Sequence, residues 1–262
     1  AFAAGTLVVT APTKVDAIGA AILQNALADL PADGSWLSKQ QAGALLAHVG
    51  IDLWPSELGG DCDAARAAAD RMGWPVVLKA ADERWRNRLD VGAVRLGLAD
   101  ADDLRAAWAD VRSVAGEGSA FVQPMAEPGV STVVRLVQDP SAGPLLSLRL
   151  GGVAVDLLVD PVSRTLPLTD RDAADLVRAI RGFSLLTGGA SGVPSDVDAL
   201  EELLHRVARV GEDLPEVAEL VLDPVLVQRS GVVPLHAGVR LLPPGSDPER
   251  GPRRLGASYA VL

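Results

Sequence analysis

The sequence has little of several features that mark particular classes of protein. Its 262 residues include one cysteine, Cys62, which excludes an internal disulfide and a metal cluster built from cysteines and fits a reducing cytoplasm. Aromatic residues make up only 3% of the chain, which argues against a surface that stacks nucleic-acid bases. The formal net charge is −10, so we expect no broad surface for nucleic acid or for an anionic membrane.

Long hydrophobic runs are missing as well. No apolar stretch approaches the length that crosses a bilayer. Residues 1–14 also lack the basic start and the long apolar core of a secretory signal. We therefore expect a cytoplasmic protein with no membrane partner. A chain of 262 residues can bury a sizeable core, either as one large domain or as two small lobes.

The first half of the chain alternates between helical and strand patterns, which predicts an α/β fold. The expected helices cover residues 15–30, 38–49, 63–73 and 100–115, and the expected strands cover 51–53, 76–79, 94–98 and 120–123. Ser38 and Gln41 have the spacing of a capping box, and Asp63 is the expected cap of the alanine-rich third helix.

Strands with antiparallel pairing dominate after Pro128-Gly129. The expected strands cover residues 130–138, 145–150, 153–158, 219–227 and 232–242, with helices over 170–181 and 197–210. The predicted domains are a tail and linker helix (1–37), a first lobe (38–128), a second lobe (129–243) and a mobile C-terminal tail (244–262) rich in Pro, Gly, Arg and Ser.

Residues 74–98 hold the clearest candidate site. A β-branched run ends on Lys79, and a returning strand begins at Val94 after Gly92. The loop between them carries Arg84, Arg86 and Arg88. A lysine at a strand end, beside a loop with glycine and guanidinium groups, suits a phosphate chain. An ordinary hairpin with a solvated tip is the alternative interpretation of the same residues.

The same stretch resembles the nucleotide-binding part of ATP-grasp proteins, in particular the β-subunit type of the NDP-forming acyl-CoA synthetases. The segments Pro-Val-Val-Leu-Lys (75–79) and Asn-Arg-Leu-Asp-Val-Gly-Ala-Val-Arg-Leu-Gly-Leu (87–98) follow that family's frame. The resemblance runs from about residue 42 to 242. It implies a two-lobed ATP-grasp fold, α/β (α+β), which holds ATP or ADP between the lobes.

The resemblance also implies which residues bind nucleotide. Lys79 would contact phosphate and Arg88 would screen it. Phe-Val-Gln-Pro-Met (121–125) resembles the family's hinge, where the main chain of Val122, Gln123 and Met125 would face adenine. Asp156 follows a Gly-Gly pair, as does the carboxylate that lies near the family's phosphohistidine. A solvated strand residue is the alternative for Asp156.

Several family residues are replaced here. Asn87 stands where the family has the histidine that carries phosphate, and a carboxamide has no nucleophilic ring nitrogen, so we expect no catalytic residue. The resemblance aligns the metal ligands with Val221, Asp223 and His236, of which only Asp223 is a hard anionic ligand. Weak binding of Mg²⁺ is therefore expected. Ala190 replaces the arginine of a further family loop.

These replacements favour a catalytically degenerate, regulatory ATP-grasp domain, a pseudoenzyme. The resemblance implies a larger chain with CoA-binding and CoA-ligase domains, and some bacterial members are fused to a GNAT-type lysine acetyltransferase. Two alternatives stay open. One is a working nucleotide-dependent acyl-CoA ligase module, and the other is an interaction scaffold that binds no nucleotide.

Overall fold

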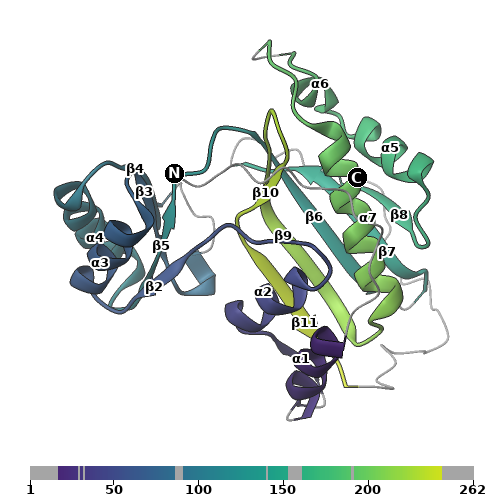
Figure 1. Cartoon of the computed structure of the whole chain (residues 1–262), viewed down its shortest axis with the longest axis horizontal. Coiled ribbons are helices and arrows are strands. Elements are labelled where there is room, and N and C mark those ends of the chain that lie inside the picture. The colour runs from purple at the N-terminus through teal and green to yellow at the C-terminus, as the bar shows by residue number, and fades with distance from the viewer. Residues whose placement is uncertain are drawn as a thin grey trace, which may run out of the picture.

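Two lobes, each built on its own antiparallel sheet, make up the molecule (Figure 1). The computed structural model describes residues 17–28, 30–31, 33–85, 91–139, 141–152, 161–189 and 192–243. Within these residues, no helix has both the length and the apolar character needed to cross a membrane. Each sheet has its own cluster of buried side chains, so the molecule has two cores.

The smaller lobe holds a four-stranded sheet in the order β2-β5-β3-β4. Its strands are β2 (Glu57–Gly59), β3 (Val76–Ala80), β4 (Val94–Leu98) and β5 (Ala120–Pro124). Its helices are α3 (Cys62–Met72), α4 (Ala101–Ala115) and the short 3-10 helix η1 (Glu83–Trp85). Small and apolar residues recur at helical spacing in α3 and α4, so both helices bury one side against the sheet.

Side chains alternate between the two faces of this sheet. The core-facing residues of its two central strands are Val76, Leu78, Ala80, Ala120 and Val122. The residues that alternate with them therefore lie on the opposite face, and these include Lys79, Phe121 and Gln123. No helix among the described residues of the smaller lobe covers this face, which is turned toward the larger lobe (Figure 1).

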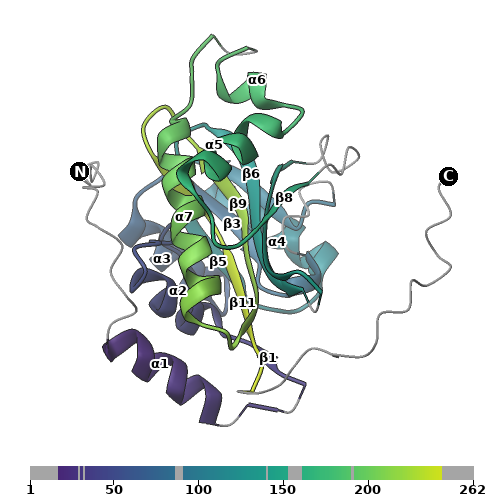
Figure 2. The same cartoon turned by 90° about the vertical axis from the view of Figure 1, so that its right-hand side faces the viewer.

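The larger lobe holds a seven-stranded sheet in the order β1-β11-β9-β6-β7-β8, with β10 beside β9. Its strands are β1 (Ser35–Trp36), β6 (Val130–Asp139), β7 (Gly143–Leu150), β8 (Val162–Thr165), β9 (Val217–Val227), β10 (Val232–Pro234) and β11 (Ala237–Leu241). Its helices are α1 (Ala17–Ala28), α2 (Lys39–Ala47), α5 (Asp170–Ala179), α6 (Phe183–Leu186) and α7 (Val197–Asp213). In Figure 2, α7 lies across the face of the sheet that is turned away from the smaller lobe.

The described residues divide between the two cores at a later point than the sequence suggests. Residues from 38 onward were expected in the first lobe, yet α2 packs in the larger core through Ala42, Leu45 and Leu46. β1 extends the same sheet by pairing with β11. The first strand of the smaller lobe begins only at Glu57. The apolar side of α2 therefore belongs to the larger lobe, and residues 51–56 connect the lobes.

Several expected elements are present and a few are wrong. The capping box of Ser38 and Gln41 is confirmed, because each side chain bonds the other's backbone N–H. The alanine-rich helix begins earlier than expected, since Asp61 and not Asp63 is its cap. Residues 51–53 form no strand, and the expected strand over 232–242 is divided into β10 and β11. The expected strand over 153–158 and the tail over 244–262 lie outside the described residues.

Candidate functional site

Lys79 lies on the face of the smaller sheet that is turned toward the larger lobe, where it meets Gln123. Its Nζ donates a hydrogen bond of 2.6 Å to Oε1 of Gln123. Gln123 is only 2% exposed, and its Nε2 donates to the main-chain oxygens of Trp54 at 3.3 Å and Leu235 at 3.2 Å. One buried amide thus joins the strand-end lysine, the connecting segment and the larger lobe.

Trp54, in the connecting segment, forms hydrogen bonds to both lobes at the same junction. Its indole Nε1 donates to the main-chain oxygen of Pro124 at 2.8 Å, and its backbone N–H donates to that of Pro234 at 2.9 Å. Sequence reasoning missed this residue. The available signal was a tryptophan in a short coil segment, because a half-buried indole needs a partner for its single N–H.

The residues of the expected hinge are placed in two different environments. Val122 is fully buried in the smaller core, and its backbone pairs with β2 on one side and β3 on the other. Gln123 faces the lobe junction, as described above. Met125 is 37% exposed and its backbone N–H donates to the main-chain oxygen of Pro75 at 3.0 Å. Met125 is therefore open to solvent, Gln123 is buried in the contact between the lobes, and Val122 is buried in the smaller core.

Two lysines meet at the junction. Burial, together with the positive charge of Lys39, lowers the pKa of Lys79 from an ordinary value of 10.5 to about 8. Lys39 is the first residue of α2, and burial lowers its pKa to about 8 as well. Its Nζ lies 4.1 Å from the centre of the Phe121 ring. Sequence reasoning did not select Lys39.

The expected metal position lies beside the same junction. Leu220 and Leu222 of β9 face the larger core, so Val221 and Asp223 point toward the smaller lobe. The backbone N–H of Asp223 donates to the main-chain oxygen of His236 at 3.1 Å. His236 directly follows Leu235, whose oxygen accepts from the Gln123 amide. Asp223 is thus connected to Gln123 through the main chain of Leu235 and His236.

Other expected site residues cannot be placed. Arg88, Asn87, Asp156 and Ala190 lie outside the described residues. Within the described residues, no group of three His, Cys, Asp or Glu side chains is arranged to hold a metal ion.

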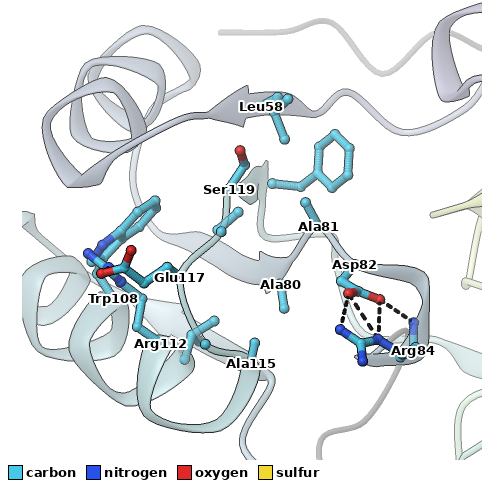
Figure 3. A pocket seen from close by; sticks show the side chains of 15 residues that line it. Leu58, Ala80, Ala81, Asp82, Arg84, Trp108, Arg112, Ala115, Glu117 and Ser119 are labelled. Carbon is cyan, nitrogen blue, oxygen red and sulfur yellow. Dashed lines mark hydrogen bonds and ion pairs between the residues drawn. The ribbon is translucent and has the colours of Figure 1, made fainter.

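A cavity of about 520 Å³ lies in the smaller lobe where β3 ends and β5 begins, and Figure 3 shows the side chains that line it. An ion pair of Asp82 with Arg84 at 2.6 Å and another of Arg112 with Glu117 at 2.8 Å lie along it. Phe121 lines it, but Lys79 and Gln123 do not. The cavity is therefore separate from the polar contacts of the junction, and it meets them only at the Phe121 ring.

Comparisons with known proteins show which family the chain resembles. Residues 29–241 match the family described as an ATP-grasp domain. Acetate–CoA ligase (ADP-forming) I of Archaeoglobus fulgidus is 35% identical over 194 residues, which cover 71% of this chain and 28% of that protein. Subunit beta of acetate–CoA ligase (ADP-forming) II of Pyrococcus furiosus is 27% identical over 199 residues, which cover 73% and 84% of the two chains.

A solved structure shows the same fold. It is dinucleotide-forming acetyl-coenzyme A synthetase 1 of Candidatus Korarchaeum cryptofilum, in complex with coenzyme A and Mg-AMPPCP, with its phosphohistidine segment pointing towards the nucleotide-binding site. The TM-score is 0.68 at 28% identity, and the match covers 85% of this chain and 99% of that chain. The chain thus spans a small part of the Archaeoglobus protein but most of the separate Pyrococcus subunit, and the expected ATP-grasp fold is confirmed. The chain belongs to the ATP-grasp family, as a domain of the kind found in NDP-forming acyl-CoA synthetases.

Proposed function

We propose that the junction between the lobes binds the phosphates of ATP or ADP through Lys79, with the adenine against the main chain near Met125. The observation that carries this proposal is the placement of Lys79. Its ammonium is largely buried at the junction, its partner there is the neutral amide of Gln123, and its pKa is lowered to about 8. A buried cation next to a neutral partner gains most from an anionic ligand.

We further propose that the domain is catalytically degenerate and has a regulatory role. Asn87 in place of the phosphate-carrying histidine removes the nucleophile, and Val221 and His236 replace two acidic oxygen ligands. The side chain of Val221 shares the junction-facing side of β9 with Asp223, so its replacement affects the place where a metal would bridge the phosphates.

The longer protein around this domain is part of the proposal. We propose that this domain is a small part of a longer chain that also contains CoA-binding and CoA-ligase domains. Asp156 and the Gly92-Ala93 pair favour a parent chain fused to a GNAT-type acetyltransferase. Reading the coding sequence on both sides of this domain tests that assignment, and a chain that ends near these bounds on both sides would contradict it.

A working acyl-CoA ligase module is the second candidate. Two of the relatives are acetate–CoA ligases, which favours this candidate. The Korarchaeum structure contains Mg-AMPPCP, so it does not support the expectation of weak Mg²⁺ binding. Calorimetric titration of the protein with ATP, ADP and CoA, each with and without Mg²⁺, separates the candidates. A degenerate domain binds ATP or ADP with little response to Mg²⁺, a ligase module requires the metal, and a scaffold gives no heat with any of the three.

We expect no phosphorylation of histidine when the protein is incubated with ATP. The reason is Asn87, because none of His48, His205 and His236 stands at the carrier position of the family frame. The measurement uses ATP labelled in the γ-phosphate, followed by mapping of label that is stable to base and labile to acid. Such label on any of the three histidines would contradict the assignment, and the Asn87→His variant shows whether the loop can still be phosphorylated.

We expect millimolar Mg²⁺ to change the affinity for ATP little, because magnesium requires several oxygen ligands in octahedral geometry and Asp223 supplies one. The triple change Val221→Asp, Asp223→Asn and His236→Asp restores the family's ligand set and should make ATP affinity depend on Mg²⁺. The titrations of both proteins with and without Mg²⁺ check this. Strong Mg²⁺ dependence in the natural sequence would favour the ligase candidate.

A further inference from the structure

The chain uses lysine very sparingly. Of its 24 basic residues only Lys14, Lys39 and Lys79 are lysines, and the other 21 are arginines. Two of the three lysines nevertheless meet at the junction between the lobes. An ammonium group is a compact positive charge with three hydrogen-bond donors, which suits a phosphate oxygen.

The two lysines reach the junction from different lobes. Lys39 begins α2, which is anchored in the larger core by Leu45 and Leu46. Its Nζ lies over the ring of Phe121, on β5 of the smaller lobe. In the sheet, Phe121 is the register partner of Lys79 on β3. The Phe121 ring and the Lys79 side chain therefore lie side by side on one face, with the Lys39 ammonium above the ring.

This arrangement of charges is unfavourable without a ligand. Both lysines are largely withdrawn from water, and the charge of Lys39 acts on Lys79. In the smaller lobe, Asp110 forms an ion pair with Arg95 and Glu57 forms one with Arg71. On the facing sheet, Glu219 pairs with Arg135. An anion between the two ammonium groups would relieve both the burial and the mutual repulsion.

We propose that Lys39 is a second phosphate-binding lysine, which forms with Lys79 a two-lysine site for the terminal phosphates of a nucleoside di- or triphosphate. This inference rests on the proposed nucleotide binding and adds a residue from the opposite lobe. It also gives the weak metal site a physical counterpart, because two ammonium groups would supply positive charge to the phosphates where Val221 of β9 and His236, between β10 and β11, replace acidic ligands. Since α2 is fixed to the larger lobe, phosphate held by both lysines ties the lobes together.

The test compares Lys39→Gln with Lys39→Arg by calorimetry on the whole chain. We expect Lys39→Gln to raise the Kd for ATP about tenfold and to leave the Kd for adenosine unchanged, since adenosine has no phosphate. Lys39→Arg keeps the charge and should stay within about threefold of the natural protein. Arg71→Gln removes an exposed cation of the smaller lobe and is the matched control, with no expected change in either Kd.

The melting temperature distinguishes this role from a structural one. Lys39→Gln removes a buried charge, so its melting temperature should equal or exceed that of the natural protein while ATP binding is lost. A variant that melts lower and loses ATP and adenosine affinity together would show that Lys39 only stabilises the junction. An unchanged Kd for ATP in Lys39→Gln, with a raised Kd in Lys79→Ala, would overturn the inference and leave the proposed function standing.

A second measurement needs no variant. Acetylation of the natural protein with an amine-reactive ester at pH 8, read by mass spectrometry, reports each lysine separately. We expect ATP and inorganic tripolyphosphate to slow the reaction at both Lys39 and Lys79. Protection of Lys79 alone would overturn the role of Lys39. If neither ligand protects either lysine and calorimetry detects no ATP binding, both the inference and the proposed function fail.

Discussion

Replacing Lys79 by alanine is expected to raise the Kd for ATP by tenfold or more. A hydrogen bond between a charged lysine and a phosphate oxygen is worth roughly 1.5–3 kcal/mol, which corresponds to about one to two orders of magnitude in affinity. Calorimetric titration of the natural protein and of Lys79→Ala gives the comparison, with Arg71→Ala as a control that removes an exposed cation of the same lobe. An unchanged Kd in Lys79→Ala would show that the phosphates lie elsewhere.

The same contact predicts how binding depends on pH. Only the protonated ammonium attracts phosphate, and the pKa of Lys79 in the free protein is lowered to about 8. Affinity should therefore be full below about pH 8 and should fall as the pH rises through this value. Bound phosphate favours the charged lysine and raises its pKa, so the protein takes up protons when it binds ATP at pH 8. Titration in two buffers of different ionisation enthalpy measures this uptake, which should be smaller in Lys79→Ala.

Replacing Gln123 by leucine is expected to lower the free energy of unfolding by about 3 kcal/mol. The change leaves the oxygens of Trp54 and Leu235 without their donor and removes the acceptor of Lys79, and each buried group that loses its partner costs about 1–3 kcal/mol. Urea unfolding followed by tryptophan fluorescence measures the loss. The matched control is Gln138→Leu, since Gln138 donates a single 3.4 Å bond to Gly211 and should cost no more than about 1 kcal/mol.

An equal, small loss in the two glutamine variants would contradict the importance of the Gln123 contacts. It would mean that water satisfies the freed groups and that the lobes are joined by other contacts. A large loss in Gln123→Leu alone supports the view that one buried amide holds the two lobes together.

The local parts of this fold could be predicted from the sequence. The capping box of Ser38 and Gln41 needs only residues three positions apart, and it is present. The strand that ends near Lys79 and the strand that begins at Val94 carry their own β-branched and glycine signals, and they pair as expected. The family resemblance around Lys79 also predicted the ATP-grasp fold, which the comparisons confirm.

The contacts between the lobes could not be predicted in the same way. Trp54 and Pro124 are 70 positions apart in the sequence, and Gln123 and Leu235 are 112 positions apart. No local sequence pattern can therefore predict either hydrogen bond. The position of Lys39 depends on α2 packing in the larger lobe, which the capping signal at its start does not specify. The arrangement of the junction therefore depends on how the two cores pack. The sequence motif around Lys79 predicted that residue but not the residues that surround it.

We expect nucleotide to bind at the lobe junction with its phosphates on Lys79. A crystal structure of the protein soaked with ADP or ATP and Mg²⁺ tests it most directly. We expect phosphate oxygens within hydrogen-bond distance of Nζ of Lys79 and adenine against the main chain near Met125. Nucleotide bound in the cavity of the smaller lobe, or anywhere away from Lys79, would contradict the account. Octahedral Mg²⁺ at Asp223 would retain the nucleotide site but favour a working ligase over a degenerate domain.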